Sequence, residues 1–221
     1  MVDASFAPAV AILTRAPSSG GKTRLFASLG RSPDPALLSA LLLDTVDGVA
    51  AEGVRRVIAV TPPEACAEVR RLAPNVDVVP QPEGDLGDRM RGVMAALFDA
   101  GAPAVALIGS DLPHVTPAVI VEALAIAASD RDTLVLGPAD DGGYYLIAAG
   151  RLSDVFSGIE WGRGRVLEQT EEAGLREGLR VRRLAPLSDV DNVDDLRRAC
   201  ASGRARRTAA WMSAQATSDG R

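Results

Sequence analysis

Ala104-Val-Ala-Leu-Ile-Gly-Ser-Asp111 is the stretch that decides the fold class of this chain, because it joins a strand-like apolar run to an acid. A short run of aliphatic and β-branched residues that ends in turn residues is typical of a buried strand. Pro113 makes continuation of that strand past the acid unfavourable. The Asp111 carboxylate is therefore expected at the carboxyl end of a central strand, where open α/β sheets bind their ligands. A lone acid there indicates either a divalent metal ion that holds a phosphate or a general base.

Outward from this stretch, apolar runs alternate with helical patterns. Strands are expected over residues 9–14, 56–61, 76–79, 104–108, 133–136, 144–148 and 179–184. Helices are expected over 36–51, 86–100 and from 116 to about 128. This alternation predicts an α/β fold with a mainly parallel sheet that helices cover on both faces. After residue 133 two strands flank a glycine-rich stretch with no helix between them, so we expect the second half of the sheet to build a different pocket.

The length of 221 residues suits one α/β domain better than two. We expect a single domain over 1–201 and a small, polar C-terminal tail over 202–221, which contains Arg204, Arg206 and Arg207. The tail is expected to extend the final helix and then to fray. Trp211 in the tail would pack either back on the domain or against a second subunit in a homodimer.

The composition excludes several classes of function. A net charge of −5 and an aromatic content of 4% favour neither a nucleic-acid partner nor base stacking. The apolar runs are strand-sized, which predicts no membrane span, and the N-terminus has no signal-peptide pattern. Cys66 and Cys200 form no CxxC pattern, so a reduced, cytoplasmic chain is expected. The single histidine, His114, excludes multi-histidine zinc sites but leaves oxygen-ligand metals such as Mg²⁺ or Mn²⁺.

The loop after the first expected strand, Thr14-Arg-Ala-Pro-Ser-Ser-Gly-Gly-Lys-Thr-Arg24, is suited to phosphate contact. Its two glycines let the backbone approach a ligand closely, and Lys22 and Arg24 add positive charge. Residues 16–23 also fit a relaxed Walker A pattern, although Ala16 and the proline after it replace the first glycine of the strict pattern. A solvated surface turn is the alternative interpretation.

Two more glycine-containing loops follow expected strands. In Gln81-Pro-Glu-Gly-Asp-Leu-Gly-Asp-Arg-Met90, Asp85 either caps the next helix or contacts a ligand, and Gln81 would be available to read a base edge. In Ala139-Asp-Asp-Gly-Gly-Tyr-Tyr145, the glycines indicate either a tight turn or a close approach of the backbone to a ligand.

Two acids in Leu187-Ser-Asp-Val-Asp-Asn-Val-Asp-Asp-Leu196 need a functional explanation. Asn192 can cap a helix whose first turn holds the later acids, which offset the helix dipole. Asp189 and Asp191, if extended, share a face. Two like charges on one face repel each other unless a cation lies between them, which makes these acids candidate metal ligands.

Five segments in this order, KTRL, QPEGDLGDRM, GSDLP, ADDGGYYLIA and DVDNVDDL, resemble a known bacterial family. That family is described as selenodomain-associated transferase or glycosyltransferase, within the GT-A nucleotide-diphospho-sugar transferase superfamily. Its relatives include phospholactate-type guanylyltransferases and molybdopterin nucleotidyltransferases. The resemblance runs from about residue 9 to residue 200. It implies a Rossmann-like GT-A three-layer sandwich with a mainly parallel mixed sheet, with the nucleotide over the first half and the acceptor over the second.

The resemblance also implies roles for individual residues. The phosphate contacts would be Arg15, Lys22 and Arg24. The base and ribose side would be formed by Gln81, Gly84 and Asp85. The acceptor pocket would be lined by Gly142 and Gly143. The metal would be held by Asp111, with Asp189 or Asp191 completing its shell, and the catalytic set would be Lys22, Asp111 and Asp189.

Two departures from the family pattern matter. Pro17-Ser18 stands where many relatives have Pro-Gly, and the usual GT-A acid pair separated by one residue is reduced here to Asp111 alone. A distant second acid is therefore required.

We expect a metal-dependent transferase with a nucleotide-activated donor and a small-molecule acceptor. Glycosyl transfer from a nucleotide-diphospho-sugar is preferred, because the resembled family carries that label; nucleotidyl transfer with release of pyrophosphate is the alternative. A P-loop NTPase would leave the acids near residue 190 unexplained. A nucleotide-binding module without turnover stays open, since no second acid lies beside Asp111.

Overall fold

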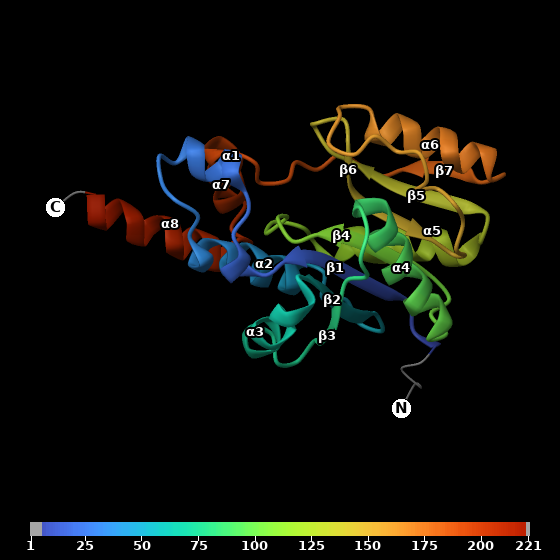
Figure 1. Ribbon diagram of the computed structural model, residues 1–221, viewed down its shortest axis with the longest axis horizontal. Helices are drawn as coiled ribbons and strands as arrows, with labels where there is room; N and C mark the ends of the chain where they lie inside the picture. Colours follow the sequence, from blue (N-terminus) through green and yellow to red (C-terminus); the bar gives the residue numbers. More distant parts are fainter. Residues whose placement is uncertain (1–5, 220–221) are drawn as a thin grey trace.

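A seven-stranded mixed sheet forms the centre of the computed structural model, which describes residues 6–219 (Figure 1). The strand order is β3-β2-β1-β4-β6-β5-β7, and only β6 runs antiparallel to its neighbours. The strands are β1 (Ala9–Arg15), β2 (Arg55–Thr61), β3 (Asp77–Pro80), β4 (Val105–Gly109), β5 (Thr133–Pro138), β6 (Tyr144–Ala149) and β7 (Arg180–Arg183). The predicted strands agree with these bounds to within two residues at each end.

Helices cover both faces of the sheet, which confirms the predicted α/β sandwich with a mainly parallel sheet. One face packs against α2 (Pro35–Gly48), α3 (Cys66–Leu72) and α5 (Pro117–Ser129), and the other against α4 (Leu86–Asp99) and α6 (Val166–Arg176). Alternate residues of β1 serve the two cores: Val10 and Ile12 face the α2 side, and Ala9 and Ala11 face the α4 side. This two-sided burial explains why residues 9–13 of β1 and residues 105–108 of β4 are all apolar.

A third, smaller core brings distant segments together at one end of the sheet. It joins α1 (Thr23–Ser28), α2 and α7 (Val193–Ala201) through buried residues such as Phe26, Leu41 and Leu196. Figure 1 shows α1 and α7 side by side above α2. The segments that lead into α1 and α7 are therefore held close to each other, although they are far apart in the sequence.

The tail was expected to extend α7. Instead it forms a separate helix, α8 (Arg206–Asp219). A turn separates the two helices, and Gly203 in this turn has φ +72°, which favours glycine. Asp44 of α2 accepts hydrogen bonds from the Thr208 amide and hydroxyl at 2.9 and 2.8 Å, so α8 starts where α2 caps it. Trp211 packs back on the same chain, where its indole donates to Asp34 at 2.7 Å.

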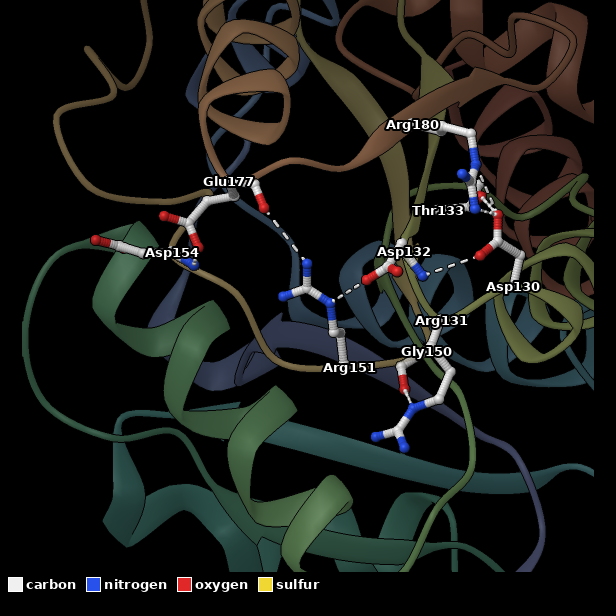
Figure 2. Close-up of polar contacts among 9 residues, drawn as sticks. All are labelled: Asp130, Arg131, Asp132, Thr133, Gly150, Arg151, Asp154, Glu177 and Arg180. Carbon is white, nitrogen blue, oxygen red and sulfur yellow. Dashed lines mark hydrogen bonds and ion pairs between the residues drawn. The ribbon is translucent and has the colours of Figure 1, made fainter.

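At the end of the sheet where β5 and β7 begin, an ion-pair network links the connecting loops (Figure 2). Asp130 binds the Arg180 guanidinium and the Thr133 hydroxyl. Arg151 binds Asp132 at 2.8 Å and approaches the Glu177 carbonyl oxygen at 3.4 Å. The network fastens the second half of the sheet at the end away from the carboxyl ends of the parallel strands. Within residues 6–219, no helix combines the length and apolar character needed to cross a bilayer.

Candidate functional site

Three carboxylates from distant parts of the chain converge at the carboxyl end of β4. Asp111, Asp189 and Asp191 each offer an oxygen, and these oxygens all lie within 4.8 Å of one another. The Val190 amide donates to the Asp111 carbonyl at 3.0 Å, which holds the 189–191 segment against the loop after β4. The predicted convergence of acids from positions 111 and 189–191 is therefore present in the structure.

Lys22 lies among these acids instead of pointing toward solvent. Its Nζ contacts the Asp111 carboxylate, donates to Asp191 Oδ1 at 2.7 Å and lies 3.8 Å from Asp189 Oδ2. The Lys22 backbone is left-handed, with φ +49°, directly before α1. Such a conformation costs a non-glycine residue about 1–2 kcal/mol. The ion pairs with the acids offset this cost.

The electrostatics of the acid cluster are those of a cation site. Burial and the negative charge of Asp111 raise the pKa of Asp189 to about 6, against the opposing effect of Lys22. Burial alone would lower the pKa of Lys22, but the neighbouring carboxylates of Asp111 and Asp191 outweigh it and raise that pKa. Three carboxylates around one ammonium leave an excess of negative charge. Because carboxylate oxygens are the ligands that Mg²⁺ and Mn²⁺ prefer, the donor set fits such an ion.

A cavity of about 560 Å³ opens beside the acid cluster, and Asp111 and Asp189 form part of its wall. This volume is within the range of small-ligand sites. The other walls come from the start of α4, the turn between β5 and β6, and the 161–164 loop. The cavity therefore spans the second half of the sheet, where the changed strand pattern predicted a different pocket.

The two glycines of the β5–β6 turn have different surroundings. Gly143 lines the cavity. Gly142 has φ +84°, and a Cβ there would overlap the carbonyl oxygen of Gly164. The Leu167 amide also donates to the Gly142 carbonyl at 2.9 Å. Gly142 thus lets the turn and the 161–164 loop pack together into one wall.

The predicted base-side residues hold the backbone in place. The Gln81 side chain is buried and its amide donates to the Thr14 and Ala59 carbonyls at 3.0 and 2.8 Å, at the ends of β1 and β2. Asp85 caps α4 by accepting from the Asp88 amide at 2.9 Å, which is the capping alternative left open by the sequence. Gly84, with φ +114°, shapes the turn before this cap.

The first loop carries the remaining predicted cations. Arg24 lies on the rim of the cavity with its Nη1 at 3.8 Å from Asp191, and most of its side chain is exposed. Arg15 ends β1, and its side chain passes over Gly21. The tip of the loop is fastened to α3, because the Ser18 amide and hydroxyl both donate to the Glu68 carboxylate. A short 3-10 turn, Pro17–Ser19, stands where a Walker A loop would wrap a phosphate.

The sequence did not identify four cavity residues, Leu86, Met90, Trp161 and Arg163. Trp161 packs on Gly87, where a Cβ would come within 3.0 Å of the indole. Because the chain has only two tryptophans, the rarity of this residue was the signal that could have marked Trp161 as a candidate cavity residue. His114 lies outside the acid cluster, and burial together with the charge of Arg198 lowers its pKa.

Comparison with known proteins gives consistent matches. Residues 45–163 match the model of a family described as "Uncharacterized protein conserved in bacteria (DUF2064)". The chain is similar to a phosphoenolpyruvate guanylyltransferase of Mycolicibacterium smegmatis, with 31% identity over 185 residues, 82% of this chain and 80% of that protein. It is also similar to a 3-phospho-D-glycerate guanylyltransferase of Phenylobacterium zucineum, with 33% identity over 144 residues, 63% of this chain and 66% of that protein.

A solved structure agrees with these matches. It is that of a protein from Desulfovibrio desulfuricans G20 assigned as a nucleotide-diphospho-sugar transferase. The TM-score is 0.77 and the identity 32%, over 86% of this chain and 84% of that one.

Proposed function

This chain belongs to the DUF2064 family of bacterial proteins, and from that membership we propose that it is a metal-dependent nucleotidyltransferase. It is a transferase that uses a nucleotide-activated donor, in the GT-A group of folds. The preference for glycosyl transfer rested on a family label. Both curated relatives are guanylyltransferases, which favours the nucleotidyl alternative with GTP as donor.

The observation that carries this proposal is the cluster of Asp111, Asp189 and Asp191 at the mouth of the cavity. These three residues would hold Mg²⁺ or Mn²⁺. A divalent ion bound there supplies positive charge that offsets the charge on the phosphates of the donor and on the departing pyrophosphate. No other cluster of three possible ligands occurs in the described residues 6–219.

The reaction is written as attack of an acceptor phosphate oxygen on the α-phosphorus of the donor. The bond from the α-phosphorus to the bridging oxygen breaks, and pyrophosphate leaves with the electron pair. With a divalent ion held by Asp111, Asp189 and Asp191, the Lys22 ammonium would be available to bind the donor phosphates. Arg24 on the rim and Arg15 would add fixed positive charge, which stabilises the leaving group.

Each half of the site would bind a different substrate. The base and ribose would lie near Gln81, Gly84 and Asp85. Because the Gln81 amide nitrogen and the Asp85 carboxylate are already bonded to the backbone, they would act mainly by holding the shape of this surface. The acceptor would enter the 560 Å³ cavity, with Gly143 in its wall. Small phosphorylated acids, the acceptors in the names of the relatives, are the class to test first.

The experiment is an assay of pyrophosphate release from each nucleoside triphosphate with Mg²⁺ and either phosphoenolpyruvate or 3-phospho-D-glycerate. We expect release from GTP that needs both the metal and an acceptor. Asp111→Asn and Asp191→Asn should reduce turnover by a factor on the order of 100, since each removes a charged ligand. Asp194→Asn is the matched control, because Asp194 is an exposed acid in the nearby first turn of α7.

Glycosyl transfer is the second candidate, and the likeness to the Desulfovibrio desulfuricans structure favours it. Nucleotide-diphospho-sugars would then release a nucleoside diphosphate, while triphosphates would give no pyrophosphate with any acceptor. That result would replace the first proposal with the second. A cytoplasmic location and a homodimer stay predictions; the two free thiols, Cys66 and Cys200, are compatible with a reducing compartment.

A further inference from the structure

A second cavity, of about 480 Å³, lies on the other side of the loop that follows β4. The end of α2, the start of α5 and the turn between α7 and α8 enclose it. Its wall shares no residue with the wall of the candidate active site. The size is that of a small-ligand site.

The two acids in this wall, Asp44 and Asp47, share one arginine. Asp44 is almost fully buried, and it accepts from the Thr208 amide at 2.9 Å and from Arg207 Nη1 at 3.1 Å. The same Arg207 nitrogen lies 2.6 Å from Asp47 Oδ2. Arg207 and the start of α8 therefore give both carboxylates hydrogen-bond partners, and the wall as a whole holds three arginines against these two acids.

Two further arginines in the wall have no such partner. Arg204 and Arg206 are exposed, and neither guanidinium makes an ion pair or a hydrogen bond within the part of the chain that the structure describes. The apolar part of the lining comes from Pro113, Val115 and Pro117. A locally positive cavity on a chain with net charge −5 is not a consequence of overall charge. Guanidinium groups bind phosphate and carboxylate through paired N–H donors.

We propose that this cavity is a second ligand site, which takes a small molecule bearing a phosphate or carboxylate group. Arg204 and Arg206 bind the anionic group, and the body of the ligand rests on Pro113 and Val115. The chain links this site to the acid cluster, because the Pro113–Pro117 segment follows Asp111 and Leu112 directly. The Leu112 amide is fixed to the Thr45 hydroxyl of α2 at 3.2 Å. This inference does not depend on the reaction at the first site.

The test is titration calorimetry of the full chain with inorganic phosphate and, separately, with succinate, at constant ionic strength in chloride. The wild type is compared with Arg204→Ala/Arg206→Ala. The matched control is Arg176→Ala/Arg182→Ala, which removes two exposed arginines from α6 and β7 at the far edge of the sheet. Circular dichroism melting curves establish that each variant is folded, and Arg204→Lys/Arg206→Lys retains charge without the paired donors.

We expect at least one probe to bind the wild type and the control with equal affinity. The Arg204→Ala/Arg206→Ala variant should bind it at least about 10-fold more weakly, since it loses the charge-assisted hydrogen bonds of both guanidinium groups. The lysine variant should lie between them. A preference for phosphate or for succinate identifies the ligand class. Equal binding by the wild type and the double alanine variant, an equal loss in the control, or binding of neither probe would overturn the proposal.

Discussion

Lys22 has two roles at the scale of a single residue, because its ammonium is both a partner of the acids and a candidate phosphate contact. The ammonium lies where a divalent cation would be attracted, within reach of Asp111, Asp189 and Asp191. Two unit charges 4 Å apart interact by about 4 kcal/mol at an effective dielectric of 20. A metal ion must therefore compete with the lysine for the carboxylates.

We predict that Lys22→Met binds Mn²⁺ at least about 10-fold more tightly than the wild type in the absence of nucleotide, because the competing charge is gone. The same variant should turn over more slowly, since a phosphate contact is lost. Titration calorimetry with Mn²⁺ measures the first effect and a turnover assay the second. Lys22→Arg is the control that keeps the charge. Equal or weaker Mn²⁺ binding by Lys22→Met would contradict the competition.

Gly142 sets the shape of the cavity wall, also at the residue scale. We predict that Gly142→Ala raises KM for the acceptor and lowers the Tm, because its Cβ would overlap the Gly164 carbonyl in addition to the strain at φ +84°. Gly158→Ala is the matched control, since Gly158 has φ +75° but nothing within 4 Å of the added carbon. Both variants bear the backbone cost of about 1–2 kcal/mol. Only Gly142→Ala should change acceptor KM, and the same KM effect in both would refute this assignment.

At the scale of elements, the network in Figure 2 joins the starts of β5 and β7. The hydrogen bond from Arg180 and that from the Thr133 hydroxyl lower the pKa of Asp130 to about 2 from its ordinary value of 3.8. A carboxyl whose pKa is lower in the folded than in the unfolded state stabilises the fold above the unfolded pKa. That contribution is lost as the pH falls from about 4 toward 2.

We therefore predict that Asp130→Asn lowers the Tm at pH 7 and that the difference from the wild type shrinks between pH 4 and pH 2. Thermal melts followed by circular dichroism at a series of pH values measure this. Asp99→Asn, at an exposed acid at the end of α4 with no charged partner among residues 6–219, is the control and should change the Tm little at any pH. A difference that persists unchanged at pH 2 would show that Asp130 acts through something other than its charge.

At the scale of the whole molecule, the buried carboxylate of Asp44 holds α8 against the rest of the domain. We predict that Asp44→Asn lowers the free energy of unfolding by about 2–3 kcal/mol, because Asp44 accepts charge-assisted bonds from Arg207 and caps α8. Asp47→Asn removes the exposed partner of the same arginine and should cost less than about 1 kcal/mol. Urea unfolding gives both values, and hydrogen exchange should show faster opening of α8 in Asp44→Asn alone. Equal costs would contradict the role assigned to burial.

The parts of the fold that the sequence predicted are those set by local pattern. β4 and the position of Asp111 follow from an apolar run that ends before a proline, and Asn192 caps α7 as its spacing indicated. The meeting of Asp111 with Asp189 and Asp191 followed from the family resemblance, since spacing along the chain carries no such distance. That residues 1–201 fold as one domain stays a prediction.

The features that the sequence did not predict depend mostly on tertiary contacts. The direction of Lys22 requires a left-handed backbone that lysine rarely adopts, so no propensity predicts it. The cap of α8 is Asp44, which is far away in the sequence, and the wall around Trp161 is irregular loop. Helices α1 and α3 were missed because they are short, with six and seven residues. Helix α6 was missed although its buried residues Val166, Thr170 and Ala173 recur at helical spacing. The sequence likewise left open whether Asp85 caps a helix or binds a ligand, and the structure shows that it accepts from the Asp88 amide. The burial of the Gln81 amide depends on its contact with the Thr14 carbonyl, which is distant in the sequence.

The ammonium of Lys22 gives this chain an internal counterion. Dialysis against a chelator should therefore leave a folded protein with its melting temperature little changed, because the acids keep a positive neighbour. In the proposed metal-dependent reaction, loading with Mn²⁺ would then be an exchange of one cation for another, and the Lys22 side chain would become free only with the metal bound. The availability of Lys22 to bind the donor phosphates would therefore depend on the concentration of divalent ions in the surrounding solution.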